Sequence, residues 1–365
     1  RALLRARRRA LGAEHPNTRS TMSHLAETLR SRGDLSGAWL LHSQVLDARR
    51  RVLGAEHPDT LTSMSYQAGT RWEEGDLAGV RELEQQVLES RRKVLGAEHP
   101  DTPASMGLLA SMLWAEGDLA GARRLEEQEL ELRLRTRGRE HPEVLISMGN
   151  LAISLRTEGD LAGAQQLQVS VLEIRRRVFG CEHPKTLTSM SDLSITLRAQ
   201  GELSSAVRLQ ESLLEARRRV LGAEHEATLH SMNNLAVTLR VAGDLEGARR
   251  LQQQALETRR RCLGAERPDT LVAMGSLAVT LRKQGDLVGA RQLQEQVLDI
   301  WRRVFGVEDR DTLHAMSNLS VTLRAQGDLP GARELEEQAL EVRLRALGTE
   351  HPDTLASMRG LAKTL

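Results

Sequence analysis

The chain has few aromatic side chains, few cysteines and no excess of charge of either sign. Phe, Trp and Tyr make up 2% of its 365 residues, whereas apolar residues as a group make up 40%. The interior must therefore be built from Leu, Ala, Val and Met. No stretch approaches the roughly 18 consecutive apolar residues that a membrane-spanning helix needs, so the sequence predicts no membrane partner.

The charge balance and the cysteine content indicate which partners and which cellular compartment the protein can have. Lys and Arg number 51 and Asp and Glu 50, a net charge of +1, so we expect no general attraction to nucleic acid or acidic lipid. The two cysteines, Cys181 and Cys262, lie far apart in the sequence and are not expected to form a disulfide. Isolated thiols and the absence of a signal peptide predict a cytoplasmic location.

One element of the sequence returns at a fixed step of 42 residues, without insertion or deletion. Such a period indicates one supersecondary unit repeated in tandem, with each copy burying its apolar face against its neighbours. The sequence therefore predicts a solenoid in place of the two or three domains that the length alone would suggest. The recurring glycines are Gly12, Gly54, Gly96, Gly138, Gly180, Gly222, Gly264, Gly306 and Gly348.

Each repeat reads as two helices. Between Leu229 and Leu239 the apolar residues follow the spacing of one helical face, and a second such helix runs from Leu245. Gly243 and Asp244 between them are typical of a helix end followed by an N-cap. Gly247 recurs in most repeats although glycine costs about 1 kcal/mol in a helix interior, which we interpret as a close approach of two helices.

The linker between repeats reads Leu-Gly-Ala-Glu-His-Pro-Asp-Thr, as at 53–60. Its proline suits the first position of a helix. Each copy supplies one histidine and one glutamate, and the stack separates the copies, so no tetrahedral metal cluster is expected from the linkers. We predict a capping or loop-packing role for the linker histidines, and neither a metal nor a cofactor.

The second helices end on runs of arginine, as at 49–51, 175–177, 217–219 and 259–261. Glutamates precede these runs, and Glu173 with Arg177, Glu215 with Arg219, and Glu257 with Arg261 have the spacing of helical ion pairs. We interpret the runs as solvated helix ends matched to the helix dipole, not as a nucleic-acid surface.

The pattern Met-x-x-Leu-Ala-x-x-Leu-Arg-x-x-Gly-Asp-Leu-x-Gly-Ala resembles tetratricopeptide repeats. The 42-residue length and the linker resemble the kinesin-light-chain-like subtype. The resemblance implies an all-α fold, an α-solenoid of helix-turn-helix units that winds into a right-handed superhelix. We expect a single solenoid over 1–365: the end of a second helix at 1–16, eight complete repeats over 17–352, and the start of a first helix at 353–365. Because the chain starts and stops inside helical patterns, we expect a fragment of a longer protein.

In that family the first helices line a concave groove that grips an extended peptide, and asparagines of these helices hold the peptide backbone. The resemblance places this position at Asn150, Asn234 and Asn318, with Asn233 beside the second of them. Six residues further on, the same face carries arginines, which suit carboxylate ligands and predict an acidic protein or peptide partner. These arginines are Arg156, Arg198, Arg240, Arg282 and Arg324.

Two alternatives stay open for this face. The arginines could instead pair with acids of adjacent second helices, such as Glu211, Asp299 and Glu336. Tyr66, Trp72 and Trp114 interrupt the pattern in the second and third repeats, either as a binding hot spot or as filling for an irregular stack. On the second helices, Trp39 and Trp301 take polar or arginine positions, and exposed tryptophans there would suggest a second surface or contact with a neighbouring domain.

These features favour a noncatalytic protein-interaction scaffold that binds a peptide in its groove. The alternative is a C-terminal sensor region of a signal-transducing nucleotidase whose catalytic domain lies outside this chain. An enzyme is not expected, because no Gly-x-Ser-x-Gly, His-Glu-x-x-His or Cys-x-x-Cys segment occurs. Unpaired helices at the two ends would also allow end-to-end self-association.

Overall fold

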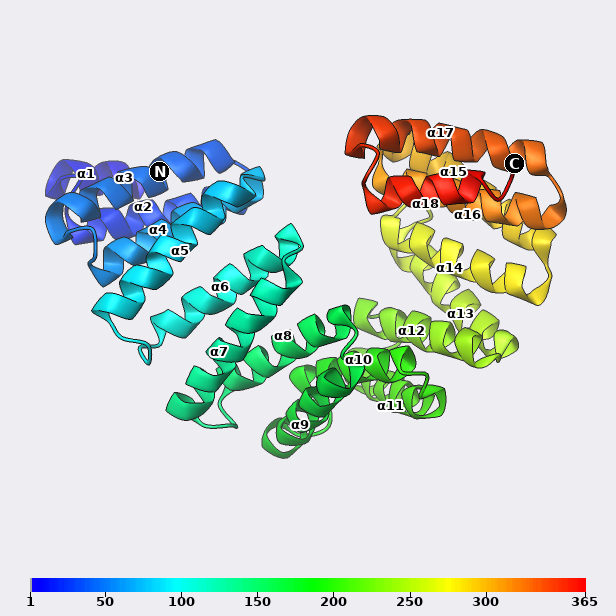
Figure 1. The fold of residues 1–365 in the computed structure, drawn as a ribbon, viewed down its shortest axis with the longest axis horizontal. Helices are drawn as coiled ribbons and strands as arrows, with labels where there is room; N and C mark the ends of the chain where they lie inside the picture. The colour runs from blue at the N-terminus through cyan, green and yellow to red at the C-terminus, as the bar shows by residue number, and fades with distance from the viewer. Residues whose placement is uncertain (1) are drawn as a thin grey trace. The chain divides into compact units, whose positions relative to one another are not determined.

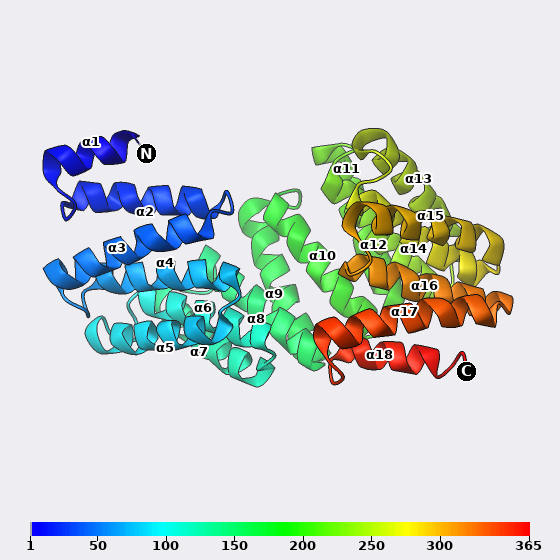
Figure 2. The same cartoon turned by 90° about the horizontal axis from the view of Figure 1, so that it is seen from above.

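The computed structural model describes residues 2–365, which form 18 helices and no strand (Figure 1; Figure 2 gives a second view). The chain divides into two compact units, unit 1 (Arg1–Ile174) and unit 2 (Arg175–Leu365), and each is described by itself. The main packing partners of each helix are its neighbours along the chain, as in α12 with α11 and α13. The all-α class and the tandem helical hairpins are thus confirmed.

The even-numbered helices are the first helices of the repeats, and the odd-numbered helices are the second helices. The first helices are α2 (Pro16–Arg30), α4 (Pro58–Glu74), α6 (Asp101–Glu116), α8 (Pro142–Glu158), α10 (Pro184–Ala199), α12 (Glu226–Ala242), α14 (Pro268–Gln284), α16 (Arg310–Gln326) and α18 (Pro352–Leu361). The second helices are α1 (Ala2–Leu11), α3 (Leu35–Leu53), α5 (Leu77–Val94), α7 (Leu119–Arg137), α9 (Leu161–Phe179), α11 (Leu203–Leu221), α13 (Leu245–Leu263), α15 (Leu287–Phe305) and α17 (Leu329–Leu347).

The linker histidines cap the first helices, as the sequence predicts. His57 lies at the N-cap of α4, and its Nδ1 accepts a hydrogen bond of 3.1 Å from the backbone N–H of Asp59. Asp309 replaces the histidine at α16 and accepts from two backbone N–H groups, whereas Arg267 at α14 makes no such bond. The histidine therefore acts as a helix cap, a role that a carboxylate can also fill.

The recurrent glycine near the start of most second helices has a different cause from the one predicted. In α13 the carboxylate of Asp244 accepts a hydrogen bond of 2.8 Å from the backbone N–H of Gly247. A Cβ at this glycine would lie 2.2 Å from an oxygen of the same carboxylate. The expectation of a close approach between two helices is wrong, because the nearest atoms belong to the capping side chain of the helix itself.

Leu, Met and Ala form the core, as the composition requires. The largest fully buried side chains include Leu145, Leu229, Leu271 and Met316. Trp301 of α15 is only 4% exposed and lies in a buried cluster, so it does not form a second, outer interaction surface. Trp39 of α3 is half-buried.

The first arginine of each run is buried or half-buried and not solvated, which corrects the prediction for these positions. In unit 2, Nη1 of Arg217 donates to the carbonyl of Ala227 at 3.0 Å and to Oγ of Ser231 at 2.6 Å. In unit 1, Arg91 bonds in the same way to the carbonyl of Asp101 and to Ser105. In these repeats the arginine ties the end of one second helix to the start of the next helix, and its hydrogen bonds offset part of its desolvation. Arg259 makes no such bond among the described residues.

The last basic residue of most second helices pairs with the linker glutamate of the preceding repeat. Arg219 lies 2.6 Å from Glu182, and Arg261 lies 2.5 Å from Glu224, so the i, i+4 pairs predicted for these two arginines are wrong. The same arrangement recurs within both units. Its other members are Arg51 with Glu14, Lys93 with Glu56, Arg135 with Glu98, Arg303 with Glu266, and Arg345 with Glu308.

Two further sequence expectations concern the cysteines and the membrane. Cys181 and Cys262 are both exposed and free, as predicted. Among the described residues, no helix combines the length and the apolar character needed to cross a bilayer.

Candidate functional site

The first helices of unit 2 approach one another directly. In addition to its sequence neighbours, α14 contacts both α12 and α16. We call the surface formed by α10, α12, α14 and α16 the first-helix face of unit 2. It carries most of the residues that the sequence singles out.

The asparagines that the sequence singles out lie on first helices in both units. Asn150 on α8 and Asn318 on α16 are exposed, and Asn233 and Asn234 on α12 are half-exposed. Within the described part of the chain, none of these four side-chain amides makes a hydrogen bond to the protein. Their donors and acceptors therefore remain available to a ligand.

The arginines that follow are half-buried, and the structure separates them into two kinds. Arg324 has a complete set of partners, because its Nη1 lies 3.2 Å from the carboxylate of Glu336 and also donates to the carbonyl of Gly360 and the hydroxyl of Thr364. Of the open alternatives, pairing with a second-helix acid therefore holds for Arg324.

Arg240 and Arg282 have no such partners. Among the described residues neither side chain has an ion pair or a hydrogen bond to the protein, and Nε of Arg282 is buried without a partner. Burial lowers the pKa of Arg240, and the like charges of Arg282 and Arg198 lower it further. The pKa of Arg282 is likewise lowered by burial and then by the charge of Arg324. Arg240 and Arg282 therefore repel each other, and neither has a counter-ion among the described residues.

The other two arginines that the sequence singles out are Arg198 in unit 2 and Arg156 in unit 1. Nη1 of Arg198 lies 3.5 Å from Oγ1 of Thr238, at the limit of a hydrogen bond. Arg156 of α8, in unit 1, is half-buried, and its Nε is buried without a partner.

The difference between the arginines follows from a row of second-helix residues that the sequence reasoning missed, except for Glu336. We call it the inner polar row, because one buried polar residue recurs every 42 residues. Its members are His42, Glu84, Glu126, Gln168, Gln210, Gln252, Gln294 and Glu336. The signal was present in the sequence as a polar residue at a fixed register inside an otherwise apolar helix face.

The inner polar row decides which arginine is neutralised. Arg324 and Glu336 are 12 residues apart, and the same offset joins Arg240 to Gln252 and Arg282 to Gln294. Gln294 uses its amide to donate to the carbonyl of Asn318 at 3.2 Å. A neutral amide stands where Arg324 has a carboxylate, so the charges of Arg240 and Arg282 are left without a counter-ion in the part of the chain that the structure describes.

A cavity brings together two of the predicted residues. It has a volume of about 230 Å³, and it opens among three successive first helices. Arg240 of α12, Gly275 and Ser276 of α14, and Asn318 of α16 are part of its lining. Gly275 and Ser276 leave room between the arginine of one repeat and the asparagine two repeats further on.

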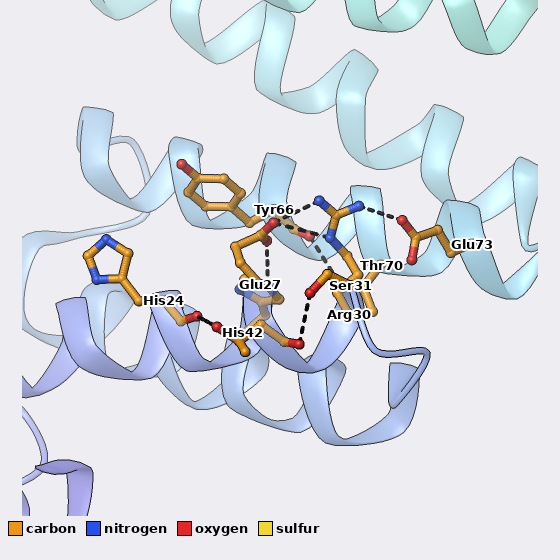
Figure 3. A network of polar contacts seen from close by, with 9 residues as sticks. His24, Glu27, Arg30, Ser31, His42, Tyr66, Thr70 and Glu73 are labelled. Atoms are coloured by element: carbon orange, nitrogen blue, oxygen red, sulfur yellow. Dashed lines mark hydrogen bonds and ion pairs between the residues drawn. The ribbon is translucent and has the colours of Figure 1, made fainter. Parts of the chain in front are cut away.

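Unit 1 has a different arrangement on its first helices. Figure 3 shows Glu27 between Arg30 and His42: the carboxylate lies 2.7 Å from Arg30 and 3.2 Å from Nε2 of His42. Arg30 also pairs with Glu73 at 2.5 Å, and the ring of Tyr66 stacks on His42 with 5.7 Å between centroids. In this repeat the arginine is neutralised by the protein.

The aromatic residues of unit 1 are divided between core and surface. Trp72 is half-buried and packs against the cluster of Ala68, Val80 and Met112, whereas Trp114 and Tyr66 are each 44% exposed. The structure therefore places Trp72 as filling of the stack and leaves the other two rings accessible.

A solenoid of helical hairpins with an open side-chain face defines a helical-repeat scaffold, a fold that generally serves noncatalytic protein interaction. Family models described as tetratricopeptide repeat match almost the whole chain, and the chain belongs to that family. One model matches residues 18–59 and 60–101, and the other matches 101–169, 143–219, 205–261, 228–299 and 269–345.

One solved structure supports the kinesin-light-chain-like subtype, and a second shares the fold. The chain is 28% identical to a putative kinesin light chain with nearly identical repeats from Podosopora anserina; the match covers 57% of this chain and 99% of that one, with a TM-score of 0.51. BtubC (BKLC) from P. vanneervenii is 22% identical over 65% of this chain and 93% of its own, with a TM-score of 0.52.

A third solved structure shares the fold alone. It is a signal transduction ATPase with a tetratricopeptide-repeat sensor from Pyrococcus horikoshii, 14% identical, with a TM-score of 0.53. The match covers 89% of this chain but 49% of that protein. No curated protein matches the chain.

Proposed function

We propose that unit 2 binds an extended, acidic segment of a partner protein on its first-helix face. The observation that carries this proposal is the pair Arg240 and Arg282, two half-buried cations without a counter-ion from the described protein. A carboxylate of the ligand would supply the missing charge and relieve the repulsion between them. Arginine suits this role because its planar group can hold a carboxylate with two parallel hydrogen bonds.

The free amides of Asn234 and Asn318 complement the arginines. An extended peptide presents alternating backbone N–H and C=O groups, and a carboxamide can donate to one and accept from the other. The arginines would thus select acidic side chains, while the asparagines hold the backbone without regard to sequence.

Peptide binding to the full chain tests the proposal. Fluorescence anisotropy would compare acidic peptides with basic peptides of equal length, at low and at high salt. Each charge-assisted contact contributes about 1.5–3 kcal/mol, so Arg240→Gln combined with Arg282→Gln should weaken acidic-peptide binding at least tenfold. Binding should also weaken with salt.

A matched control comes from the second helices. Arg261→Gln combined with Arg303→Gln removes the same net charge from exposed helix ends, where both arginines pair with linker glutamates. Acidic-peptide affinity should change little in this variant. A preference for basic peptides, or equal losses in the two double variants, would contradict the proposal.

A second candidate function is the sensor region of a signal-transducing nucleotidase. The likeness to the repeat sensor of the Pyrococcus horikoshii protein favours it at the level of fold. A test is to read any coding sequence that precedes Arg1, because a Gly-x-x-x-x-Gly-Lys-Ser/Thr segment there would identify a nucleotide-binding domain. The location in the cytoplasm and end-to-end association remain predictions.

A further inference from the structure

Three metal-ligating side chains of unit 2 converge at the start of two neighbouring first helices. Glu226 and His230 lie one turn apart on α12, with 3.4 Å between Oε1 and Nε2, and Asp269 lies in the first turn of α14. One donor atom from each residue lies within 4.8 Å of the others. We propose that Glu226, His230 and Asp269 form a binding site for a divalent transition-metal ion of the zinc type.

Two of the three residues are departures from the repeat. Glu226 takes the first helical position, which is proline in most repeats, and His230 takes a position that is Ser, Thr, Val, Ile or Ala in all but one of the other repeats. Asp269 is the ordinary aspartate of the linker. The expectation of no metal site was drawn from the linker histidines, and His230 lies outside the linker. The two substitutions place both new donors next to a carboxylate that the repeat already supplies.

The donor set favours zinc over calcium or magnesium. An imidazole nitrogen suits zinc, nickel and cobalt, whereas calcium and magnesium prefer oxygen ligands only. Three protein donors leave the remaining coordination positions to water. The side chains of Glu226 and His230 are exposed by 68% and 52%, so an ion can reach them from solvent.

The charge around the site also suits a cation. Arg259 of α13 is 3% exposed and interacts electrostatically with Asp269 and Glu226. Ala273 stands where most repeats have serine, and Arg259 makes no hydrogen bond within the described structure. One arginine faces two carboxylates, so a net negative charge remains for the ion.

The chain contains a natural control two repeats further on. His314 of α16 corresponds to His230, and Asp353 of α18 corresponds to Asp269, and both line one cavity. The position of Glu226 is occupied there by Arg310, which is exposed. This second location has two of the three donors and a positive charge in place of the third, so it should not bind the ion.

Isothermal titration of the full chain with ZnCl2, with circular dichroism to verify folding, tests the proposal. The wild type should bind one zinc ion at this site, and Glu226→Gln and His230→Ala should each weaken that binding at least tenfold. His314→Ala should leave it unchanged. Arg310→Glu should add a second zinc site of similar affinity, because it completes the triad with His314 and Asp353.

Zinc should also raise the melting midpoint of the wild type and not that of His230→Ala, since an ion that binds only the folded state stabilises it. Because the linker histidines are retained in every variant, weak zinc binding to them cancels in the comparison. Unchanged zinc affinity in both Glu226→Gln and His230→Ala, or no saturable binding by the wild type, would overturn the proposal.

Discussion

Replacing Glu84 by glutamine should stabilise unit 1. The side chain is fully buried, one of its carboxylate oxygens has no partner among the described residues, and the other accepts a hydrogen bond of 3.3 Å from Ser65. Burial raises the pKa of Glu84, and the attraction of Arg91 offsets this only in part. Trp72 occupies the position at which Arg324 neutralises Glu336, so Glu84 carries the cost of a buried charge.

The magnitude follows from the hydrogen bond that the equivalent residue Gln294 makes. Gln294 donates to the carbonyl of Asn318, and the equivalent acceptor for a glutamine at position 84 is the carbonyl of Leu108. Removing the charge and satisfying one buried group should together raise the unfolding free energy by about 1–3 kcal/mol at neutral pH. Chemical denaturation followed by circular dichroism measures this gain.

The dependence on pH gives a second measurement. Because the pKa of Glu84 is raised in the folded state, the folded protein binds the proton more readily than the unfolded chain. The penalty is therefore present above the folded pKa and fades as the pH falls toward the ordinary value of 4.5. The advantage of Glu84→Gln should shrink in the same range.

Glu336→Gln is the matched control in the same register. It removes the ion pair with Arg324, which is 23% exposed, and should destabilise unit 2 by about 2 kcal/mol or more. If Glu84→Gln and Glu336→Gln changed stability in the same direction, the account of the inner polar row would be refuted.

Two further predictions concern stability. Burial lowers the pKa of His42, so the unfolded chain binds a proton at this residue more readily than the folded chain, and the unfolding free energy should fall as the pH drops below about 6.5. His42→Gln should make the unfolding free energy depend less on pH in denaturation experiments between pH 8 and 5.5. An unchanged dependence on pH would contradict this. Arg217→Ala should lower the unfolding free energy by about 2 kcal/mol, because the carbonyl of Ala227 and the hydroxyl of Ser231 lose their donor. The exposed neighbour Arg218→Ala should change it by less than about 0.5 kcal/mol in the same urea titration, and equal effects would refute the bridging role.

The fold could be predicted almost entirely from the sequence, because a strict period leaves little freedom in where helices begin and end. Gly243 and Asp244 mark a helix end and a start by their own backbone chemistry, and the structure has both there. The role of Gly247 was not predictable in the same way. Its explanation depends on where the carboxylate of Asp244 points, and a helical periodicity does not contain that direction.

The positions of the candidate-site residues could be predicted from the sequence, but which of the arginines have a counter-ion could be predicted only in part. Periodicity places Arg240 and Arg324 at the same point of their repeats, but whether each is neutralised depends on the second-helix residue 12 positions later. Glu336 pairs with Arg324, whereas the neutral Gln252 at the equivalent position provides no charge for Arg240. The burial of Trp301 escaped prediction for a similar reason, because it requires knowing which residue lies opposite.

The exchange at Trp301 offers a spectroscopic handle on single junctions of the array. The arginine that usually holds this place bonds to a serine 14 residues later, and here tryptophan is combined with Ala315 in one buried cluster. At this junction an aromatic filling replaces the polar one, whereas the repeat before it keeps Arg259 and has Ala273 in place of the serine. Moving the tryptophan–alanine pair to positions 217 and 231 would put a fluorophore at one chosen junction, and its emission would report when that junction opens.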